Sequence, residues 1–366
     1  MSSTPDPLLE VEHLRTVFPL RAPDRRLRGV DAAAVDDVSF RIGRGETLGL
    51  VGESGSGKSV TALSIIRLVV PPGRIAAGRI TLDGQDLLGL DERAMRRIRG
   101  RRIGFVFQEP MVALNPVYTI GYQIRETLAV HDLARGAAAR RRALELLAAV
   151  RVPDPARRVD EYPHQLSGGL RQRAMIAIAL AAEPSLLIAD EPTTALDVTV
   201  QAEILDLLRE MRRAFHLSML LITHDLGIIA EMADRVAVMY AGRIVETAPV
   251  ADLFAQPLHP YTRGLLASIP GREPGARLRA IPGVVPPLGQ LPPGCAFAPR
   301  CPERFEPCER EPPAETAVGP RGRPSTSSGR PEALEGRGSD GPEGPPHRSV
   351  RCYLHAPEHA GTVKTS

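Results

Sequence analysis

Apolar runs alternate with amphipathic segments along most of the chain. Four of these runs have the length of buried strands: 47–51, 186–190, 219–223 and 236–240. Two more strand segments are expected near the N-terminus: 8–11 and 35–42. One face of a helix is marked by apolar residues at helical spacing: Ile204, Leu207, Leu208 and Met211. Strands that alternate with helices in this way favour an α/β fold with a mainly parallel sheet.

A predominantly helical pattern occupies about 110–180 and predicts an inserted helical subdomain. Its longest apolar run, 174–182, has nine residues and follows two arginines, so it indicates a buried helix. A membrane-spanning helix would need roughly 18 or more apolar residues. After about 255 the composition changes, and 320–346 consists almost wholly of Gly, Pro, Ser, Arg and Glu, which predicts a disordered insertion. The predicted division is therefore a first domain at 8–255 and an extension at 256–366.

Composition narrows the class of protein. The 366 residues provide ample material for a core, and a net charge of +3 is too small to favour nucleic acid as a partner. The first residues lack the basic and apolar regions of a signal peptide, so a cytosolic protein is expected. Arginine carries almost all of the positive charge, because the chain has only two lysines, Lys58 and Lys364.

Lys58 lies in a glycine-rich segment between the predicted strand 47–51 and a helix predicted over 59–68. The segment reads as a phosphate loop, in which backbone N–H groups and a helix N-terminus surround the phosphates of a nucleotide. Lys58 is expected to contact the β- and γ-phosphates, and the Ser59 hydroxyl is expected to bind Mg²⁺. The predicted ATP-binding residues of this loop are Gly52, Glu53, Ser54, Gly55, Ser56, Gly57, Lys58, Ser59 and Val60.

A second nucleotide motif follows the apolar run 186–189. Asp190 ends this strand, so its carboxylate is expected at the C-terminal edge of the sheet, where ligands of open α/β sheets bind. Asp190 is predicted to hold Mg²⁺ directly or through water. Glu191 is the candidate general base for the attacking water.

A third motif stands between these two and runs into Arg171 and Arg173: Leu166, Ser167, Gly168, Gly169 and Leu170. The order of the three motifs resembles the ATP-binding subunits of ABC transporters, over nearly the whole chain. The resemblance implies an ABC-type P-loop ATPase with an antiparallel β subdomain, an inserted helical subdomain and a Cys-containing C-terminal extension. It also implies that residues 166–170 face the ATP of a partner subunit, so that two ATP molecules lie between two such domains.

The resemblance assigns further roles. Gln108 matches the glutamine that senses Mg²⁺ and water, and His224 matches the histidine that contacts the γ-phosphate. Phe18 is the best match for the aromatic residue that packs on adenine, and Val35 is expected to flank the base. The loop that crosses the dimer interface corresponds to Ala195, Leu196 and Asp197.

Two further segments resemble the oligopeptide, dipeptide and nickel importers within this family: 109–116, and 257–266 followed by 281–283. This resemblance implies a second, non-identical ATPase subunit, two membrane permeases, an extracytoplasmic binding protein and a peripheral position on the cytoplasmic face of the bacterial inner membrane. The transported solute, peptide or nickel, stays open.

Three other classes of ABC protein fit the sequence less well. A DNA-repair ATPase would need a long coiled coil between the nucleotide motifs, a translation ABC protein would carry two ATPase domains, and a regulatory subunit would lack Glu191 or His224.

All four cysteines lie in the extension, at intervals of five, six and forty-three residues: Cys295, Cys301, Cys308 and Cys352. Disulfides are disfavoured in the cytosol, whereas thiolates suit a zinc ion or an iron–sulfur cluster. Zinc sites usually have closer cysteine pairs, so this spacing favours other arrangements. Peptide importers with a similar tail carry a [4Fe–4S] cluster, which the resemblance therefore implies. Cluster, zinc and unliganded thiols stay open.

Overall fold

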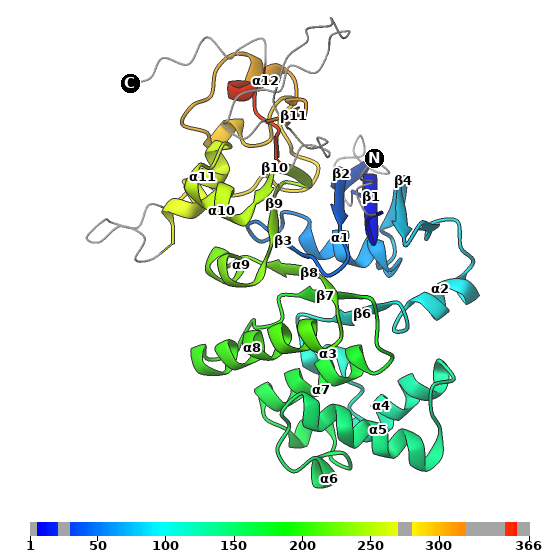
Figure 1. The fold of residues 1–366 in the computed structure, drawn as a ribbon. Helices are drawn as coiled ribbons and strands as arrows, with labels where there is room; N and C mark the ends of the chain where they lie inside the picture. The colour runs from blue at the N-terminus through cyan, green and yellow to red at the C-terminus, as the bar shows by residue number, and fades with distance from the viewer. Residues whose placement is uncertain (1–5, 21–29, 270–279, 319–347, 357–366) are drawn as a thin grey trace, which may run out of the picture.

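The computed structural model describes residues 6–20, 30–269, 280–318 and 348–356. Its largest sheet crosses the middle of the molecule (Figure 1), with the strand order β11-β12-β10-β9-β3-β8-β7-β6. The strands from β9 to β6 pair in parallel, and the other three pair antiparallel. Their bounds are Thr316–Ala317, Ser349–Val350, Arg243–Pro249, Arg235–Tyr240, Thr47–Val51, Ser218–Thr223, Leu186–Asp190 and Ile103–Val106.

A smaller antiparallel sheet with the order β2-β1-β4-β5 packs beside the phosphate-loop strand. Its strands are Asp31–Ile42, Leu9–Pro19, Arg74–Leu82 and Gln85–Asp86. The sequence predicted only the first part of β1, because register shifts interrupt its apolar alternation. It predicted nothing at β4, whose first six residues are mostly exposed and show no apolar pattern. A shared core of buried aliphatic residues joins the two sheets.

Four of the predicted strands are confirmed as β3, β7, β8 and β9, which are buried along nearly their whole length. Helix α1 (Lys58–Ile65) follows β3 across the glycine-rich segment. The remaining helices around the parallel strands are α2 (Glu92–Ile98), α8 (Val198–Ala214) and α9 (Leu226–Met232). The arrangement is the predicted α/β fold, with strand ends β3, β7 and β8 meeting at one edge.

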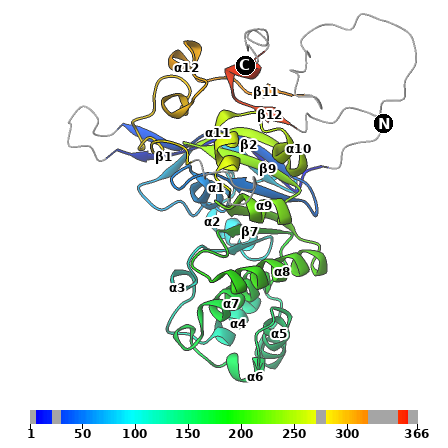
Figure 2. The same ribbon diagram turned by 90° about the vertical axis from the view of Figure 1, so that its left-hand side faces the viewer.

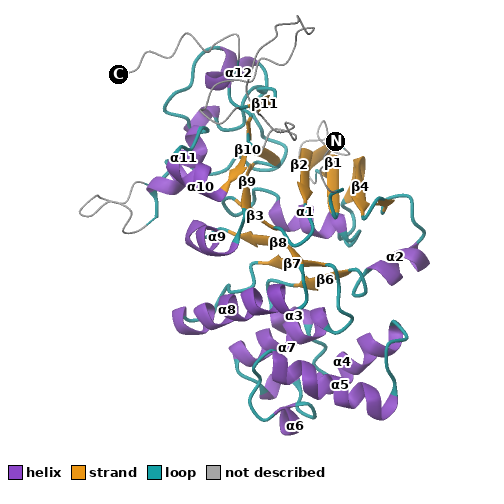
Figure 3. Cartoon of the chain, viewed as in Figure 1, coloured by secondary structure: helices purple, strands orange, loops and turns teal. Residues whose placement is uncertain are grey.

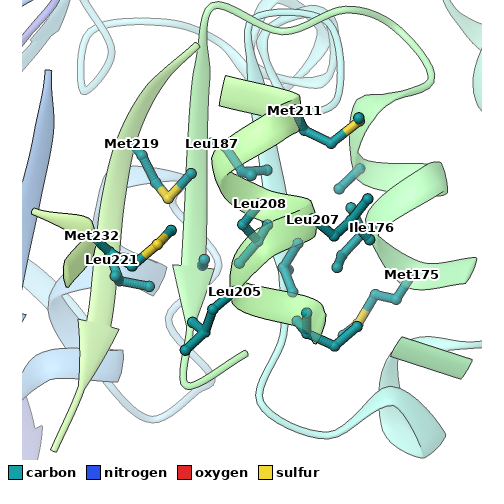
Figure 4. Close-up of a cluster of buried hydrophobic side chains, with 14 of the residues drawn as sticks. Met175, Ile176, Leu187, Leu205, Leu207, Leu208, Met211, Met219, Leu221 and Met232 are labelled. Atoms are coloured by element: carbon teal, nitrogen blue, oxygen red, sulfur yellow. The ribbon is translucent and has the colours of Figure 1, made fainter. Parts of the chain in front are cut away.

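Helices α3 to α7 gather at one end of the molecule (Figures 2 and 3). Their bounds are Pro110–Ala113, Ile120–Val130, Gly136–Ala149, Pro155–Arg158 and Gly168–Leu180, with a 3₁₀ turn at Pro163–Gln165. The apolar run 174–182 lies mostly in α7, which is buried, as predicted. Figure 4 shows how α8 connects this end with the sheet, because Leu207 and Leu208 pack between Ile176 of α7 and Leu187 of β7. None of the helices in the described segments is long and apolar enough to cross a membrane.

The C-terminal region packs against the antiparallel side of the large sheet (Figure 1). Strand β12 pairs with β10, and Glu246 of β10 lies opposite Val350. The helices are α10 (Val250–Ala255), α11 (Pro260–Ala267) and α12 (Pro307–Arg310), with 3₁₀ turns at Ala298–Arg300 and Tyr353–His355. The predicted insertion at 320–346 lies outside the described residues.

Candidate nucleotide site

The glycine-rich segment folds into a tight loop between β3 and α1, and two of its glycines have no space for a side chain. A Cβ atom on Gly52 would lie 2.1 Å from the carbonyl oxygen of Met239. Gly57, the residue before α1, has a φ of 106°, and its Cβ would lie 2.5 Å from the carbonyl oxygen of Ala34. No side chain stands at these two positions, so the backbone of the loop can approach an anion closely at the start of the helix.

The side chain of Lys58 lies inside this loop and is 5 % exposed. Its ammonium donates to the carbonyl oxygens of Gly52 at 2.8 Å and Glu53 at 3.1 Å. Burial lowers the pKa of Lys58, and the nearby carboxylates of Glu191 and Asp190 oppose that shift. The lysine is thus held as a positioned cation at the bottom of the loop.

Asp190 lies at the end of β7, beside the beginning of α1. The hydroxyl of Ser59 donates to Oδ1 of Asp190 over 3.1 Å. Burial raises the pKa of Asp190, whereas the Ser59 hydrogen bond acts in the opposite direction. A hydroxyl and a carboxylate at one strand end are the oxygen ligands that suit Mg²⁺.

Three predicted catalytic residues meet at Glu191, which follows β7 and has a positive φ of 46°. Its Oε2 atom lies 3.4 Å from Nε2 of Gln108 and 3.4 Å from Nδ1 of His224. The same oxygen accepts a hydrogen bond from the hydroxyl of Thr194 at 2.8 Å. Thr194 belongs to none of the motifs recognised in the sequence, although its position three residues after the glutamate places both in one turn. The convergence gives a carboxylate that is oriented on several sides, as a general base requires.

A pocket lies over the phosphate loop and extends to these residues. Its lining includes residues 54–60 together with Gln108 and Glu191. Phe18 packs instead beside Gly73, and Val35 is fully buried in the core, so the structure brings neither into this lining. Other small and apolar residues complete the pocket: Ala33, Ala34, Ala241, Gly242, Pro286, Leu288 and Leu291.

The motif at 166–170 forms the N-terminus of α7. Ser167 is the N-cap, and its Oγ accepts from the backbone N–H of Leu170 at 3.4 Å. Ser167 and Gly168 are exposed, and the lining of the phosphate-loop pocket includes none of the residues 166–170. Leu196, from the loop at 195–197, packs beside Gly168, and Asp197 caps α8 by accepting from the N–H of Val200. The two motifs therefore share one surface, separate from the phosphate loop of the same chain.

The four cysteines line one small cavity in the C-terminal region, although 43 residues separate the last two. All four are free thiols. Burial raises the pKa of Cys301 to about 11 and that of Cys352 to about 12. Backbone N–H groups point at three of the sulfurs and oppose this shift: Phe297 and Ala298 at Cys295, Glu303 at Cys301, and Leu354 at Cys352. In the parts of the chain that the structure describes, no group of three or more Cys, His, Asp or Glu side chains could hold a single metal ion.

Two family models match the chain. The first is described as ABC transporter and covers residues 35–194. The second is described as the C-terminal region of oligopeptide/dipeptide transporters and covers residues 245–308. The two matches thus include the phosphate loop, the motif at 166–170 and Glu191, and in the C-terminal region Cys295, Cys301 and Cys308.

The chain is similar to a protein of Brucella abortus strain 2308 that is named a peptide import ATP-binding protein. The two are 54 % identical over 325 residues, which cover 85 % of this chain and 94 % of the relative. Among solved structures, the fold resembles a dimeric ATP-binding cassette in a post-hydrolysis state with ADP and phosphate. The two chains are 28 % identical with a TM-score of 0.57, and the match covers 66 % of this chain and 98 % of that one. A component of an ABC transporter complex from Clostridium perfringens gives 27 % identity and a TM-score of 0.56, with coverage of 69 % and 92 %.

Proposed function

The chain belongs to the ATP-binding subunits of ABC transporters, of the oligopeptide/dipeptide transporter type, and we propose that it energises the import of di- or oligopeptides by hydrolysing ATP. The observation that carries the ATPase is the meeting of Gln108, Glu191 and His224 opposite the phosphate loop. The peptide assignment rests on the C-terminal region and on the Brucella relative.

The phosphate loop binds the triphosphate through its glycine-rich backbone and the ammonium of Lys58. Mg²⁺ would be held by Ser59 and Asp190, with Gln108 nearby, and it supplies neutralisation of the charge on the β- and γ-phosphates. The buried position of Lys58 strengthens its attraction to the phosphates, because less water screens the charge.

Glu191 acts as the general base that orients and polarises the attacking water. Thr194 and Gln108 hold its carboxylate by hydrogen bonds of 2.8 and 3.4 Å, and so fix the direction in which the base faces. His224 lies next to the same carboxylate and is proposed to contact the γ-phosphate. Positioned groups of this kind provide most of the rate enhancement in phosphoryl transfer.

The motif at 166–170 is proposed to bind the ATP of a second ATPase subunit. Three features support this: its helix N-terminus is exposed, it lies apart from the chain's own pocket, and it shares a surface with 195–197. A helix N-terminus with bare glycine amides favours an anion. The remaining proposed partners are two permeases and an extracytoplasmic binding protein, with this chain peripheral on the cytoplasmic face of the bacterial inner membrane.

The test of this function is uptake by a strain that lacks the gene. Loss of labelled di- or oligopeptide uptake, restored by the wild-type chain and not by Lys58→Ala, is the expected result. Loss of nickel uptake alone would overturn the peptide assignment and leave the ATPase in place. A purified Lys58→Ala protein that hydrolyses ATP at the wild-type rate would overturn the motor role itself.

We further propose that the four cysteines bind a [4Fe–4S] cluster. The feature that supports it is the cavity that the four side chains line, because thiolates are the usual ligands of such a cluster. Cluster cysteines bind different irons, so they lie farther apart than four ligands of one zinc ion. Protein purified without oxygen is expected to contain iron and inorganic sulfide and to absorb broadly in the visible range. Colourless, iron-free protein from that preparation would refute the cluster.

A further inference from the structure

The C-terminal region contacts the phosphate loop through Arg300, which lies in the turn before Cys301. The Arg300 side chain is only 5 % exposed, and its Nη1 atom lies 3.0 Å from Oε2 of Glu53. Glu53 is the second residue of the phosphate loop, 247 positions earlier in the chain. The arginine is buried and the glutamate is 28 % exposed, so the contact is a part-buried, charge-assisted hydrogen bond.

Tyr261 holds the main chain of the same residue. Its hydroxyl accepts a hydrogen bond from the backbone N–H of Glu53 at 2.9 Å, and its ring is fully buried between Tyr240 and Phe297. The backbone and the side chain of Glu53 are thus both fixed by residues that follow the parallel strands. The shape of the phosphate loop therefore depends on the C-terminal region.

Arg300 also anchors a segment that reaches the nucleotide pocket. Its Nε atom donates to the carbonyl oxygen of Pro282 at 2.8 Å. A few residues later the chain passes over the pocket, and three of its side chains line it: Pro286, Leu288 and Leu291. Gly289, with a φ of 84°, turns the segment against Leu20, where a Cβ would come within 2.6 Å of the leucine side chain.

The lining of the pocket is of two chemical kinds. The phosphate loop contributes Lys58, Ser59 and its glycines, whereas apolar side chains come from Leu288 and Leu291 of the segment after Pro282, and from Ala33 and Ala34 beside Gly57 and Gly242. ATP has the same division, with a triphosphate at one end and a flat base at the other. Because the loop sets the position of the phosphates, the base and ribose are left to the apolar part.

We propose that residues 281–300 form a wall of the nucleotide site, in which Leu288 and Leu291 contact the base and ribose and Arg300 is a positioning residue. This inference rests on the proposed ATPase function. Arg300 contacts the wall at the carbonyl oxygen of Pro282 and the phosphate loop at the carboxylate of Glu53, and so connects the two. Two of the cysteines that line the thiol cavity lie close to this arginine in the chain, because Cys301 directly follows it and Cys295 precedes it by five residues.

The wall is tested by calorimetric titration of the full chain with ATP, in a chelator so that hydrolysis does not run, and separately with inorganic triphosphate. The double variant Leu288→Ala, Leu291→Ala is expected to weaken ATP binding by about tenfold, because it removes apolar contact area. Its affinity for triphosphate is expected to be unchanged, since that ligand has no base. Unchanged ATP affinity, or an equal loss for both ligands, would overturn the wall.

The positioning role predicts a different pattern. Arg300→Gln is expected to weaken the binding of ATP and of triphosphate alike, by about tenfold, because it releases the loop as well as the wall. Arg300→Lys keeps the charge and is expected to recover part of that loss. In a cycle with Glu53→Gln, the double variant is expected to lose little more than either single variant, since both remove one pair.

These outcomes separate a positioning role from a purely structural one. Arg300→Gln is expected to raise KM for ATP far more than it lowers kcat. A lower Tm with unchanged affinity for both ligands would overturn the positioning role, as would full additivity in the cycle. Lys58→Ala is the reference variant for the proposed function. If the wild-type protein binds neither ATP nor triphosphate, the proposed function is refuted. If the wild-type protein binds both ligands and the Arg300 and Leu288 variants bind them equally well, only this inference is refuted.

Discussion

The hydroxyl of Ser59 donates to the carboxylate of Asp190 over 3.1 Å, although the two residues are 131 positions apart in the chain. This contact joins the start of α1 to the end of β7 and presents two oxygen ligands side by side. Asp190→Asn keeps the shape and removes the charge. The concentration of Mg²⁺ that gives half-maximal ATPase activity is expected to rise, because removing even an indirect contact typically costs about 10–100-fold in metal affinity.

A magnesium titration of the ATPase rate measures this effect. Asp160→Asn is a suitable control, because Asp160 pairs with Arg140 on the surface of the helical region and has no contact with the nucleotide site. An Asp190→Asn protein with an unaltered magnesium requirement would remove Asp190 from the metal site.

Glu191→Gln tests the general base. The amide cannot accept a proton, so kcat is expected to fall by about 10²–10⁴-fold. ATP affinity is expected to stay close to the wild-type value, because the phosphate loop is untouched. Measurement of both quantities on one preparation separates hydrolysis from binding. Hydrolysis by this variant at the wild-type rate would mean that another group activates the water.

Thr194→Val tests the orientation of that base. The hydroxyl of Thr194 donates to Glu191 over 2.8 Å, and valine has nearly the same shape without the donor. The loss of one hydrogen bond to a charged group predicts a fall in kcat of about tenfold or more, smaller than that for Glu191→Gln. An unchanged kcat would show that Gln108 and the backbone suffice to hold the carboxylate.

The convergence of the residues of the candidate nucleotide site was predictable because they stand at strand ends. Asp190 and His224 both follow apolar runs, and parallel strands bring such residues to one edge of the sheet. The pair Arg300–Glu53 has no such signal, because both side chains belong to types that usually lie on the surface. Arg300 is buried only by the tertiary packing of the C-terminal region, and no local pattern in the sequence indicates that packing.

The antiparallel elements were less predictable for a related reason. Strand β4 exposes most of its first six residues, and β1 contains register shifts, so neither shows a regular alternation. The pocket lining is a tertiary property as well. Phe18 is an aromatic residue of β1, yet its ring packs beside Gly73, whereas Leu288 lines the pocket from a loop without a recognisable pattern.

Glu246 is expected to stabilise the attachment of the C-terminal region. Its carboxylate is completely buried and accepts from the backbone N–H groups of Leu258 and His259, each at 2.9 Å, beside the guanidinium of Arg348. Glu246→Ala leaves these two N–H donors without their acceptor and removes the counter-charge of Arg348, which keeps its hydrogen bond to the carbonyl oxygen of Gln256. Such a loss predicts a decrease of about 3 kcal/mol or more in the free energy of unfolding, measured by urea denaturation.

Asp160→Ala is expected to change stability little, since its pair with Arg140 is exposed. Equal effects of the two substitutions would contradict the role of Glu246.

His259 predicts how stability changes with pH. The imidazole is fully buried, and its Nδ1 atom accepts from the backbone N–H of Tyr261 at 3.0 Å. Burial lowers its pKa to about 3, and the charge of Arg263 acts in the same direction. The imidazole of His259 therefore binds a proton below about pH 6.5 in the unfolded chain, but only below about pH 3 in the folded chain. The contribution of this residue to stability is complete above pH 6.5 and declines as the pH falls, by at most about 1.4 kcal/mol per pH unit.

His259→Asn isolates this effect. Asparagine accepts well at a helix N-cap, which is the position of residue 259 in α11, and it does not titrate. Urea denaturation of both proteins between pH 4 and pH 8 is the measurement, compared as the difference in their free energies of unfolding. That difference is expected to be constant above about pH 7 and to shift in favour of the variant at lower pH, because only the wild type must keep a buried histidine neutral. Parallel curves over the whole range would show that His259 is protonated as readily in the folded chain as in the unfolded one.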